Sequence, residues 1–170
     1  MNIIAAIDPS LTNTAVCTGD AGHYDMASFS SKPRGAQLDF RMARYLDLVD
    51  RVSSHLADIP GVSTIFIEGY SHGSKFNGEV LAEYGALLRC ALMKIAPTRE
   101  VAPKSLKKFA TGKGNADKIS VATSLSRRYD VEFKTSDEYD AFGLFQLGLV
   151  ACGMANPETA KQREAAEAVY

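Results

Sequence analysis

Apolar runs and apolar spacing divide the chain into strands and helices. Continuous apolar or β-branched stretches bounded by turn formers predict strands at residues 2–8, 14–18, 24–29, 63–68 and 98–102. Apolar residues that recur every third or fourth position predict helices at residues 37–56, 79–95, 105–110, 116–129 and 136–154. The early strands follow one another as an antiparallel meander, and the later ones alternate with helices. We therefore expect a mixed sheet with helices on both faces, a three-layer α/β/α domain.

Length and composition fit one globular domain followed by a short tail. The chain has 170 residues, of which 46% are hydrophobic and 23% are charged, enough to bury a core without disulfides. We place the domain at residues 1–155 and a tail rich in Ala and Glu at 156–170, which is either a helix or a frayed end. A net charge of −1 lacks the basic excess of many nucleic-acid binders. A binding face, however, depends on where the lysines gather.

Cysteine usage favours a reducing compartment. Cys17, Cys90 and Cys152 are odd in number, lie in apolar stretches and show no C-x-x-C spacing, so we interpret them as reduced core thiols. The start of the chain has neither a basic segment nor a long apolar stretch of the kind that directs secretion. No window approaches ~18 apolar residues in a row. These features predict a cytoplasmic protein that does not enter a membrane.

Carboxylates stand at points where the surrounding sequence predicts burial. Asp8 ends the first apolar strand, Glu68 ends the fourth, and Asp140 enters a helix that is apolar nearly all round. Asp137 shares one face of that helix with Asp140. Buried carboxylates that converge repel one another unless a cation compensates them. Oxygen ligands suit Mg²⁺ or Mn²⁺, whereas the three histidines do not offer the spacing that zinc requires.

Each acid also has an ordinary structural interpretation. Asp8 before a proline can form a turn, and Glu68 can be an ion-pair partner at a strand end. Thr135 and Glu138 form a capping-box pattern, which would make Asp137 an acid that stabilises the helix N-terminus. Asp140 lies beyond the first turn, so this interpretation fits it least.

The order of these motifs resembles the RuvC family of Holliday-junction resolvases over residues 1–152. The resemblance rests on a strand ending in Asp8-Pro9, on Ile65-Phe66-Ile67-Glu68, on the segment 112–118 and on Asp137-x-x-Asp140-Ala141. It implies a ribonuclease-H-like fold with parallel fourth and fifth strands. It further implies that the four acids bind two Mg²⁺ ions, replaceable by Mn²⁺, and that water cuts DNA to leave a 5′-phosphate. A compact, phage-type member is expected.

The densest basic stretch lies just before the last predicted helices. It offers cationic side chains and glycine-flanked backbone amides for phosphates, through Lys104, Lys107, Lys108, Lys113 and Lys118. A solvated charged loop is the alternative. By resemblance, Lys107 and Lys118 correspond to family lysines that contact DNA phosphates, and we rank Lys108 and Lys113 after them. The Gly-Lys-Gly turn lacks the Walker A pattern, so a P-loop nucleotide site is excluded.

The loop at residues 69–78 has aromatic residues suited to stacking on unpaired bases, although an incidental aromatic in a loop is equally consistent. The resemblance places Ser71 where the family has a stacking aromatic, so Tyr70 or Phe76 would have to take that role. Gly69 and Ser10 also depart from the residues that the cellular enzymes usually show. These departures leave the cut-site preference open.

The helix at residues 79–95 has small and apolar positions that permit close packing of a second helix, namely Ala82, Gly85, Ala86, Leu88 and Leu92. Ordinary core packing explains them as well, whereas the resemblance implies a homodimer, whose symmetry matches a four-way junction.

The leading hypothesis is a junction-resolving endonuclease. A nuclease of broader specificity on branched or host DNA is the second hypothesis, and a non-catalytic junction-binding protein is the third. The related actin and sugar-kinase group needs two such domains around a nucleotide, and this chain has room for one.

Overall fold

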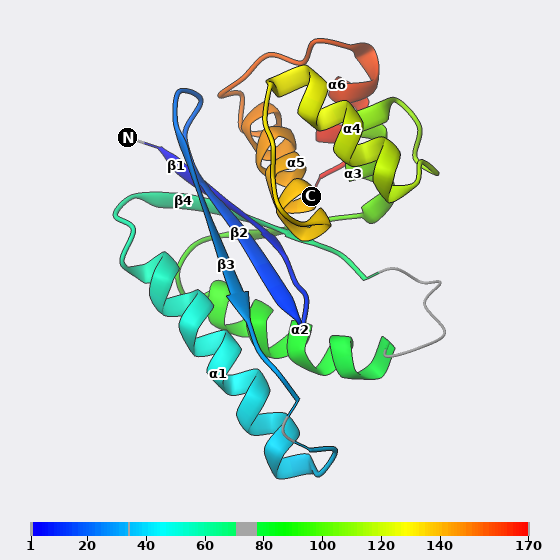
Figure 1. The fold of residues 1–170 in the computed structure, drawn as a ribbon. Coiled ribbons are helices and arrows are strands. Elements are labelled where there is room, and N and C mark those ends of the chain that lie inside the picture. Colours follow the sequence, from blue (N-terminus) through cyan, green and yellow to red (C-terminus); the bar gives the residue numbers. More distant parts are fainter. Residues whose placement is uncertain (1, 34, 71–77, 170) are drawn as a thin grey trace.

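A computed structural model describes residues 2–33, 35–70 and 78–169 (Figure 1). The strands are β1 (Ile3–Asp8), β2 (Asn13–Gly19), β3 (Tyr24–Ser30), β4 (Val62–Glu68) and β5 (Thr98–Val101). The helices are α1 (Leu38–Ala57), α2 (Gly78–Leu92), α3 (Pro103–Thr111), α4 (Lys118–Tyr129), α5 (Ser136–Ala151) and α6 (Ala160–Glu167). Most of the loop predicted at 69–78, including Phe76, lies outside the described residues.

The strands form one mixed sheet in the order β3-β2-β1-β4-β5. β1 pairs antiparallel with β2, and β2 with β3, whereas β4 runs parallel to β1 and β5 runs parallel to β4. The predicted meander and the two parallel strands are therefore confirmed. Because β1 and β4 are parallel neighbours, their carboxyl ends meet at the same edge of the sheet.

Helices cover both faces of the sheet, as Figure 1 shows: α1 and α2 lie on one face, and α5 with α3, α4 and α6 lies on the other. Residues of β1 alternate between the two cores. Ala5 and Ile7 pack with α1 and α2, whereas Ile4 and Ala6 pack with α5. Asp8 continues the second series, so its side chain belongs to the α5 face.

The central helix α5 is buried around most of its circumference, as its apolar sequence predicts. Gly148 lets it lie close to the sheet, because a Cβ there would stand 2.6 Å from the ring of Phe66 and 3.0 Å from Ile4. The capping box predicted for Thr135 and Glu138 is present and fixes where the helix begins. The acids in the first turns of α5 are thereby held over the ends of β1 and β4.

Several helix boundaries differ from the sequence prediction: α3 begins at Pro103 rather than at 105, and α5 ends at Ala151 rather than at 154. Asp117 caps α4 by accepting a hydrogen bond from the Ser120 amide at 2.8 Å, so the helix begins at Lys118 rather than at 116. α2 ends at Leu92 rather than at 95, since the chain then turns towards β5. Helix ends are poorly encoded by periodicity alone, because the cap geometry decides them.

The tail contains α6, which packs against α3 and α5. Gln162 and Ala165 of this helix are buried, and Glu164 forms an ion pair with Lys108 of α3. Arg128 of α4 pairs with Glu158, just before α6, at 3.3 Å. The tail is therefore anchored to the helices on the α5 side of the sheet.

The expectation of core thiols is wrong for two of the three cysteines. Cys17 is buried, but Cys90 and Cys152 are exposed. Cys90 lies on the outer side of α2 and Cys152 directly follows α5, where an apolar neighbourhood in sequence does not mean burial. Among the described residues, no helix combines the length and apolar character that a membrane span requires.

Candidate functional site

The ends of β1 and β4 place two carboxylates side by side. The strands pair in register up to Ile7 opposite Ile67, and the next residues are Asp8 and Glu68. Phe66 packs into the α5 core, and alternation puts Glu68 on the same face of the sheet. Asp8 is only 6% exposed. Both acids therefore point towards the first turns of α5.

Helix α5 brings two more acids to this edge. Asp140 is 9% exposed, and Asp137 lies one turn earlier on the same side of the helix. α5 packs along both β1 and β2, so these acids overhang the strand ends. The charge of Asp137 raises the pKa values of Asp8 and Asp140, which shows that the four carboxyl groups belong to one electrostatic cluster.

The cluster holds more negative charge than its surroundings compensate. Burial raises the pKa of Asp8 well above its ordinary value, and the charges of Glu68, Asp140 and Asp137 raise it further. Burial and the charge of Asp140 raise the pKa of Glu68 to about 7. A hydrogen bond between the Asp8 and Glu68 carboxyl groups raises the pKa of Asp8 and lowers that of Glu68. Both carboxyl groups are therefore harder to ionise than carboxyl groups in water.

Two lysines approach the acids from neighbouring helices. Lys118, the first residue of α4, places Nζ 3.5 Å from Oδ2 of Asp140. Partial burial lowers the pKa of Lys118, but the attraction of the acids, chiefly Asp140, outweighs it and the net shift is upward. Lys107 of α3 lowers the pKa values of Glu68 and Asp140. Both lysines thus lie close to the acid cluster.

The donor set fits a hard divalent cation. All the donors are carboxylate oxygens, which Mg²⁺ and Mn²⁺ prefer, and the raised pKa values of Asp8, Glu68 and Asp140 mark a deficit of positive charge. Within residues 2–33, 35–70 and 78–169, however, no three His, Cys, Asp or Glu side chains already form a ligand cage. In these positions Asp140 is paired with Lys118 at 3.5 Å.

A groove of about 440 Å³ opens beside Glu68. It lies between the ends of β4 and β5, the start of α3 and the Gly-Lys-Gly turn, and its lining is Gly69, Tyr70, Glu100, Ala102, Pro103, Lys104, Lys107 and Gly114. Lys104 and Lys107 of α3 add positive charge to this lining, and Tyr70 adds an aromatic ring. A segment of a polyanion fits this combination of charge and shape.

Comparison with known proteins identifies the fold. No protein-family model and no curated protein sequence matches the chain. Among solved structures, RuvC from Thermus thermophilus superposes with a TM-score of 0.69 at 16% identity, covering 91% of this chain and 99% of that one. The same protein in complex with a Holliday junction substrate gives a TM-score of 0.70, again at 16% identity, over 92% and 99% of the two chains. The chain has the RuvC fold.

The resemblance to RuvC inferred from the sequence is thereby confirmed at the level of the fold. Within that fold, the structure gathers the four acids singled out from the sequence at one edge of the sheet. The ordinary interpretation of Asp137 also holds in part, because the capping box begins α5 one residue before it.

The lysines expected to contact DNA do not all lie near the acid cluster. Lys107 and Lys118 face the acid cluster, and Lys113 is exposed in the turn between α3 and α4. Lys108 instead lies next to α6, where it pairs with Glu164. Adjacent residues on a helix diverge by about 100°, so Lys107 and Lys108 serve different surfaces. Lys108 has a structural partner that the sequence did not indicate.

The small and apolar residues of α2 that were considered for a dimer interface are partly buried and partly exposed. Gly85, Leu88 and Leu92 are buried within this chain's own fold, which is the ordinary core packing considered above. Ala82 and Ala86 are exposed and remain available to a second helix. The small positions alone therefore give weak support for a homodimer.

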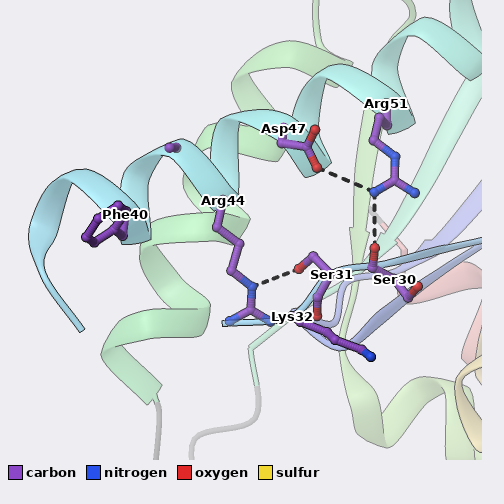
Figure 2. Close-up of a pocket in the computed structure, with 8 residues that line it drawn as sticks. Ser30, Ser31, Lys32, Phe40, Arg44, Asp47 and Arg51 are labelled. Atoms are coloured by element: carbon purple, nitrogen blue, oxygen red, sulfur yellow. Dashed lines mark hydrogen bonds and ion pairs between the residues drawn. The ribbon is translucent and has the colours of Figure 1, made fainter. Parts of the chain in front are cut away.

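A second cavity, of about 360 Å³, lies on the α1 side and contains none of the four acids (Figure 2). Its arginines are engaged in holding the fold together. Arg44 donates to the Ser31 side chain at 2.8 Å and to the Leu11 carbonyl at 2.6 Å. Arg51 donates to the Ser30 carbonyl at 3.1 Å and pairs with Asp47. These contacts fasten the exit of β3 to α1.

Sequence reasoning missed Arg89 of α2, which reaches the end of β4. Its guanidinium donates to the backbone carbonyl of Glu68 at 2.9 Å and pairs with Glu100 of β5 at 2.9 Å. No motif marks it, because its partner at Glu68 is a carbonyl and its other contacts come from residues distant in sequence.

Proposed function

We propose that the protein is a metal-dependent endodeoxyribonuclease that resolves Holliday junctions. The observation that carries the proposal is the cluster of Asp8, Glu68, Asp137 and Asp140, short of positive charge at one edge of a RuvC fold. RuvC of Thermus thermophilus has been solved with a Holliday junction substrate, which supports branched DNA as the ligand class of this fold.

The four acids would hold two Mg²⁺ ions, with Mn²⁺ as a substitute. When bound, the ions supply Lewis acidity at the scissile phosphate and an activated water, so that the cut leaves a 5′-phosphate and a 3′-hydroxyl. Asp8 and Glu68, fixed at two strand ends, define one side of the site, and Asp137 and Asp140 define the other. Their rigid placement on sheet and helix provides the positioning that phosphodiester hydrolysis requires.

Lys107 and Lys118 bind and orient the DNA strand. In the protein alone, Lys118 pairs with Asp140 at 3.5 Å. When the acids are neutralised by cations, this lysine becomes free to contact a phosphate of the incoming strand. The groove beside Glu68 receives the nucleotides that flank the cut, with Lys104 and Lys107 along its wall. Salt should therefore weaken binding steeply, as for other phosphate contacts.

Two symmetric cuts in a four-way junction require two copies of the site, and we propose a homodimer for this reason. The exposed Ala82 and Ala86 of α2 permit close approach of a second helix. A protein that cuts flaps or duplex as single nicks has no need of this symmetry.

Cleavage of defined substrates tests the proposal. Purified protein with Mg²⁺ is offered a four-way junction, a flap and a plain duplex, and Asp8→Asn protein is the control. Paired symmetric nicks in the junction alone support a resolvase. Equal cutting of all three substrates indicates a nuclease of broader specificity. Junction binding without any cut, or cutting that Asp8→Asn leaves unchanged, contradicts the proposed site.

A further inference from the structure

Arg89 connects three elements around the end of β4. Its Nη2 donates to the Glu68 carbonyl at 2.9 Å, and its Nε donates to the Glu100 carboxylate at 3.0 Å. Its Nη1 donates to the Gly85 carbonyl, one turn earlier on α2, at 3.1 Å. The Arg89 side chain is 17% exposed. A partly buried arginine with its donors distributed in this way has little freedom to move.

The same guanidinium supports the aromatic wall of the groove. Its central carbon lies 4.4 Å from the centroid of the Tyr70 ring, in cation–π contact. The Tyr70 hydroxyl donates to the Ala82 carbonyl at 3.1 Å. Gly85 makes room for this arrangement, because a Cβ there would stand 2.6 Å from the Tyr70 hydroxyl and 2.8 Å from Nη1 of Arg89. Tyr70 is thereby held against α2.

Arg89 binds the backbone at the end of β4, at the peptide that joins Glu68 to Gly69. The Gly69 amide donates to the Val101 carbonyl at 2.8 Å and closes the β4–β5 ladder. The Glu68 carbonyl, on the other side of the same peptide, is fixed by Arg89. With both polar groups of this peptide bonded, the backbone angles of Glu68 are set, and so is the direction of its side chain into the acid cluster.

We propose that Arg89 is a positioning residue that orients Glu68 and the Tyr70 wall of the groove for cleavage. The inference rests on the proposed nuclease function for its catalytic part, whereas the effect on the β4 end stands without it. Lysine cannot replace this residue, because a single ammonium lacks the planar fork that reaches a carboxylate and two carbonyls while stacking on a ring.

Amide hydrogen exchange tests the structural part without any cleavage assay. Arg89→Ala and Arg89→Lys should each accelerate exchange of the Gly69 amide at least about tenfold, the change expected when local opening is eased by ~1.4 kcal/mol. Arg41→Ala is the matched control, because Arg41 forms an ion pair with Glu83 of α2 at 3.1 Å and, within the described part of the chain, makes no hydrogen bond or ion pair with β4. Gly69 exchange that is unchanged in both Arg89 variants, or equally fast in Arg41→Ala, would overturn the proposal.

Steady-state cleavage tests the catalytic part. Arg89→Ala and Arg89→Lys should lower kcat about 10- to 100-fold, since a small misplacement of a reacting group costs this much, and should raise the Mg²⁺ concentration for half-maximal activity. KM should change less than kcat, and Arg41→Ala should match the wild type in both. Glu100→Gln leaves the bond from Arg89 to the Glu68 carbonyl in place. It should therefore lower kcat less than either Arg89 variant does.

Different results would contradict the role of Arg89 and the proposed nuclease function. A kcat within twofold of wild type in both Arg89 variants would overturn the positioning role while leaving the nuclease intact. A wild-type protein that cuts no DNA would contradict the proposed function, and Gly69 exchange would then still decide whether Arg89 fixes the end of β4.

Discussion

The acids of the candidate site differ from three acids on the protein surface in whether hydrogen-bond donors or cations stabilise the ionised carboxylate. Hydrogen bonds from the Gly22 and His23 amides lower the pKa of Asp20, and those from Ser120 lower the pKa of Asp117. Hydrogen bonds from Lys108 and Lys161 lower the pKa of Glu164. The pKa values of Asp8, Glu68 and Asp140 are instead raised by burial.

This difference separates the acids with a structural role from the acids of the proposed metal site. Where a carboxylate caps a turn or a helix, the chain supplies donors or a lysine for it. At the edge formed by β1, β4 and α5, the chain gathers carboxylates and supplies too little positive charge. Such an arrangement disfavours folding at neutral pH and is typical of sites that bind a cation or a substrate. The experiments below alter one side of this contrast at a time.

The largest effect is expected from Asp8→Asn. Removing this carboxylate should lower the cleavage rate by about 10²- to 10³-fold or more, as when a charge that organises a reacting centre is lost. Because the change also removes one of four mutually repelling acids, the free energy of unfolding in EDTA should not fall. Junction cleavage and urea denaturation measure the two quantities. Loss of activity together with loss of folding would indicate an ordinary structural acid.

Comparing two neighbouring lysines should give the next largest effect. Lys107→Ala should lower junction affinity about tenfold, because one phosphate contact and its counterion release are lost, and it should reduce the salt dependence of binding. Lys108→Ala, which removes the partner of Glu164, should leave junction affinity within about twofold of wild type on the same scale. Fluorescence anisotropy in EDTA measures both. Equal losses would show that the two faces of α3 do not differ as described.

A smaller effect is expected in the pH dependence of stability. Glu68 has a pKa of about 7 in the folded protein against an ordinary value of 4.5. Between these values the folded state holds a proton that the unfolded state has released, so the contribution of Glu68 to stability should fall as pH rises from 4.5 to about 7 and change little above it.

The raised pKa values of Asp8 and Asp140 act in the same direction. Urea denaturation in EDTA at several pH values measures the slope, and Glu68→Gln should make it shallower. A wild-type stability that climbs steadily from pH 5 to 8 would contradict the charge deficit. Mg²⁺ should offset the loss at pH 7, because a cation that binds the folded state stabilises it.

The smallest effect is expected from Asp20→Ala at the β2–β3 turn. This partly exposed acid accepts hydrogen bonds from the Gly22 and His23 amides at 2.8 and 3.0 Å, and it lies at the end of the sheet away from the acid cluster. The change should lower the melting temperature slightly and leave the cleavage rate within about twofold of wild type, as for most surface sites. A large loss of cleavage would show that activity does not depend on the acid cluster alone.

The sheet and its acids could be predicted because their signals are local. An apolar run that ends in Asp8 and another that ends in Glu68 specify both burial and strand ends. The uniformly apolar sequence of α5 specifies a central helix, which fixes the place of Asp140. Parallel pairing of β1 with β4 then brings the strand ends together without further information.

Contacts between residues that are distant in the sequence could not be predicted from local patterns. The pairing of Lys108 with Glu164 depends on how α6 packs against α3. The bond from Arg89 to the Glu68 carbonyl depends on the approach of α2 at Gly85. Cys90 and Cys152 have apolar neighbours in the sequence, yet Cys90 lies on an exposed side of α2 and Cys152 lies just beyond the end of α5. Partners distant in sequence leave no periodicity to detect.

The central claim is that Asp8, Glu68, Asp137 and Asp140 share divalent cations. Crystals soaked in MnCl₂ test it most directly, through the anomalous scattering of manganese. The expected result is two peaks at the carboxyl ends of β1 and β4, each about 2.0–2.3 Å from carboxylate oxygens of these residues, as for hard cations bound by oxygen. Manganese bound elsewhere, or Asp8, Glu68 and Asp140 without a shared ion at saturating MnCl₂, would contradict the claim.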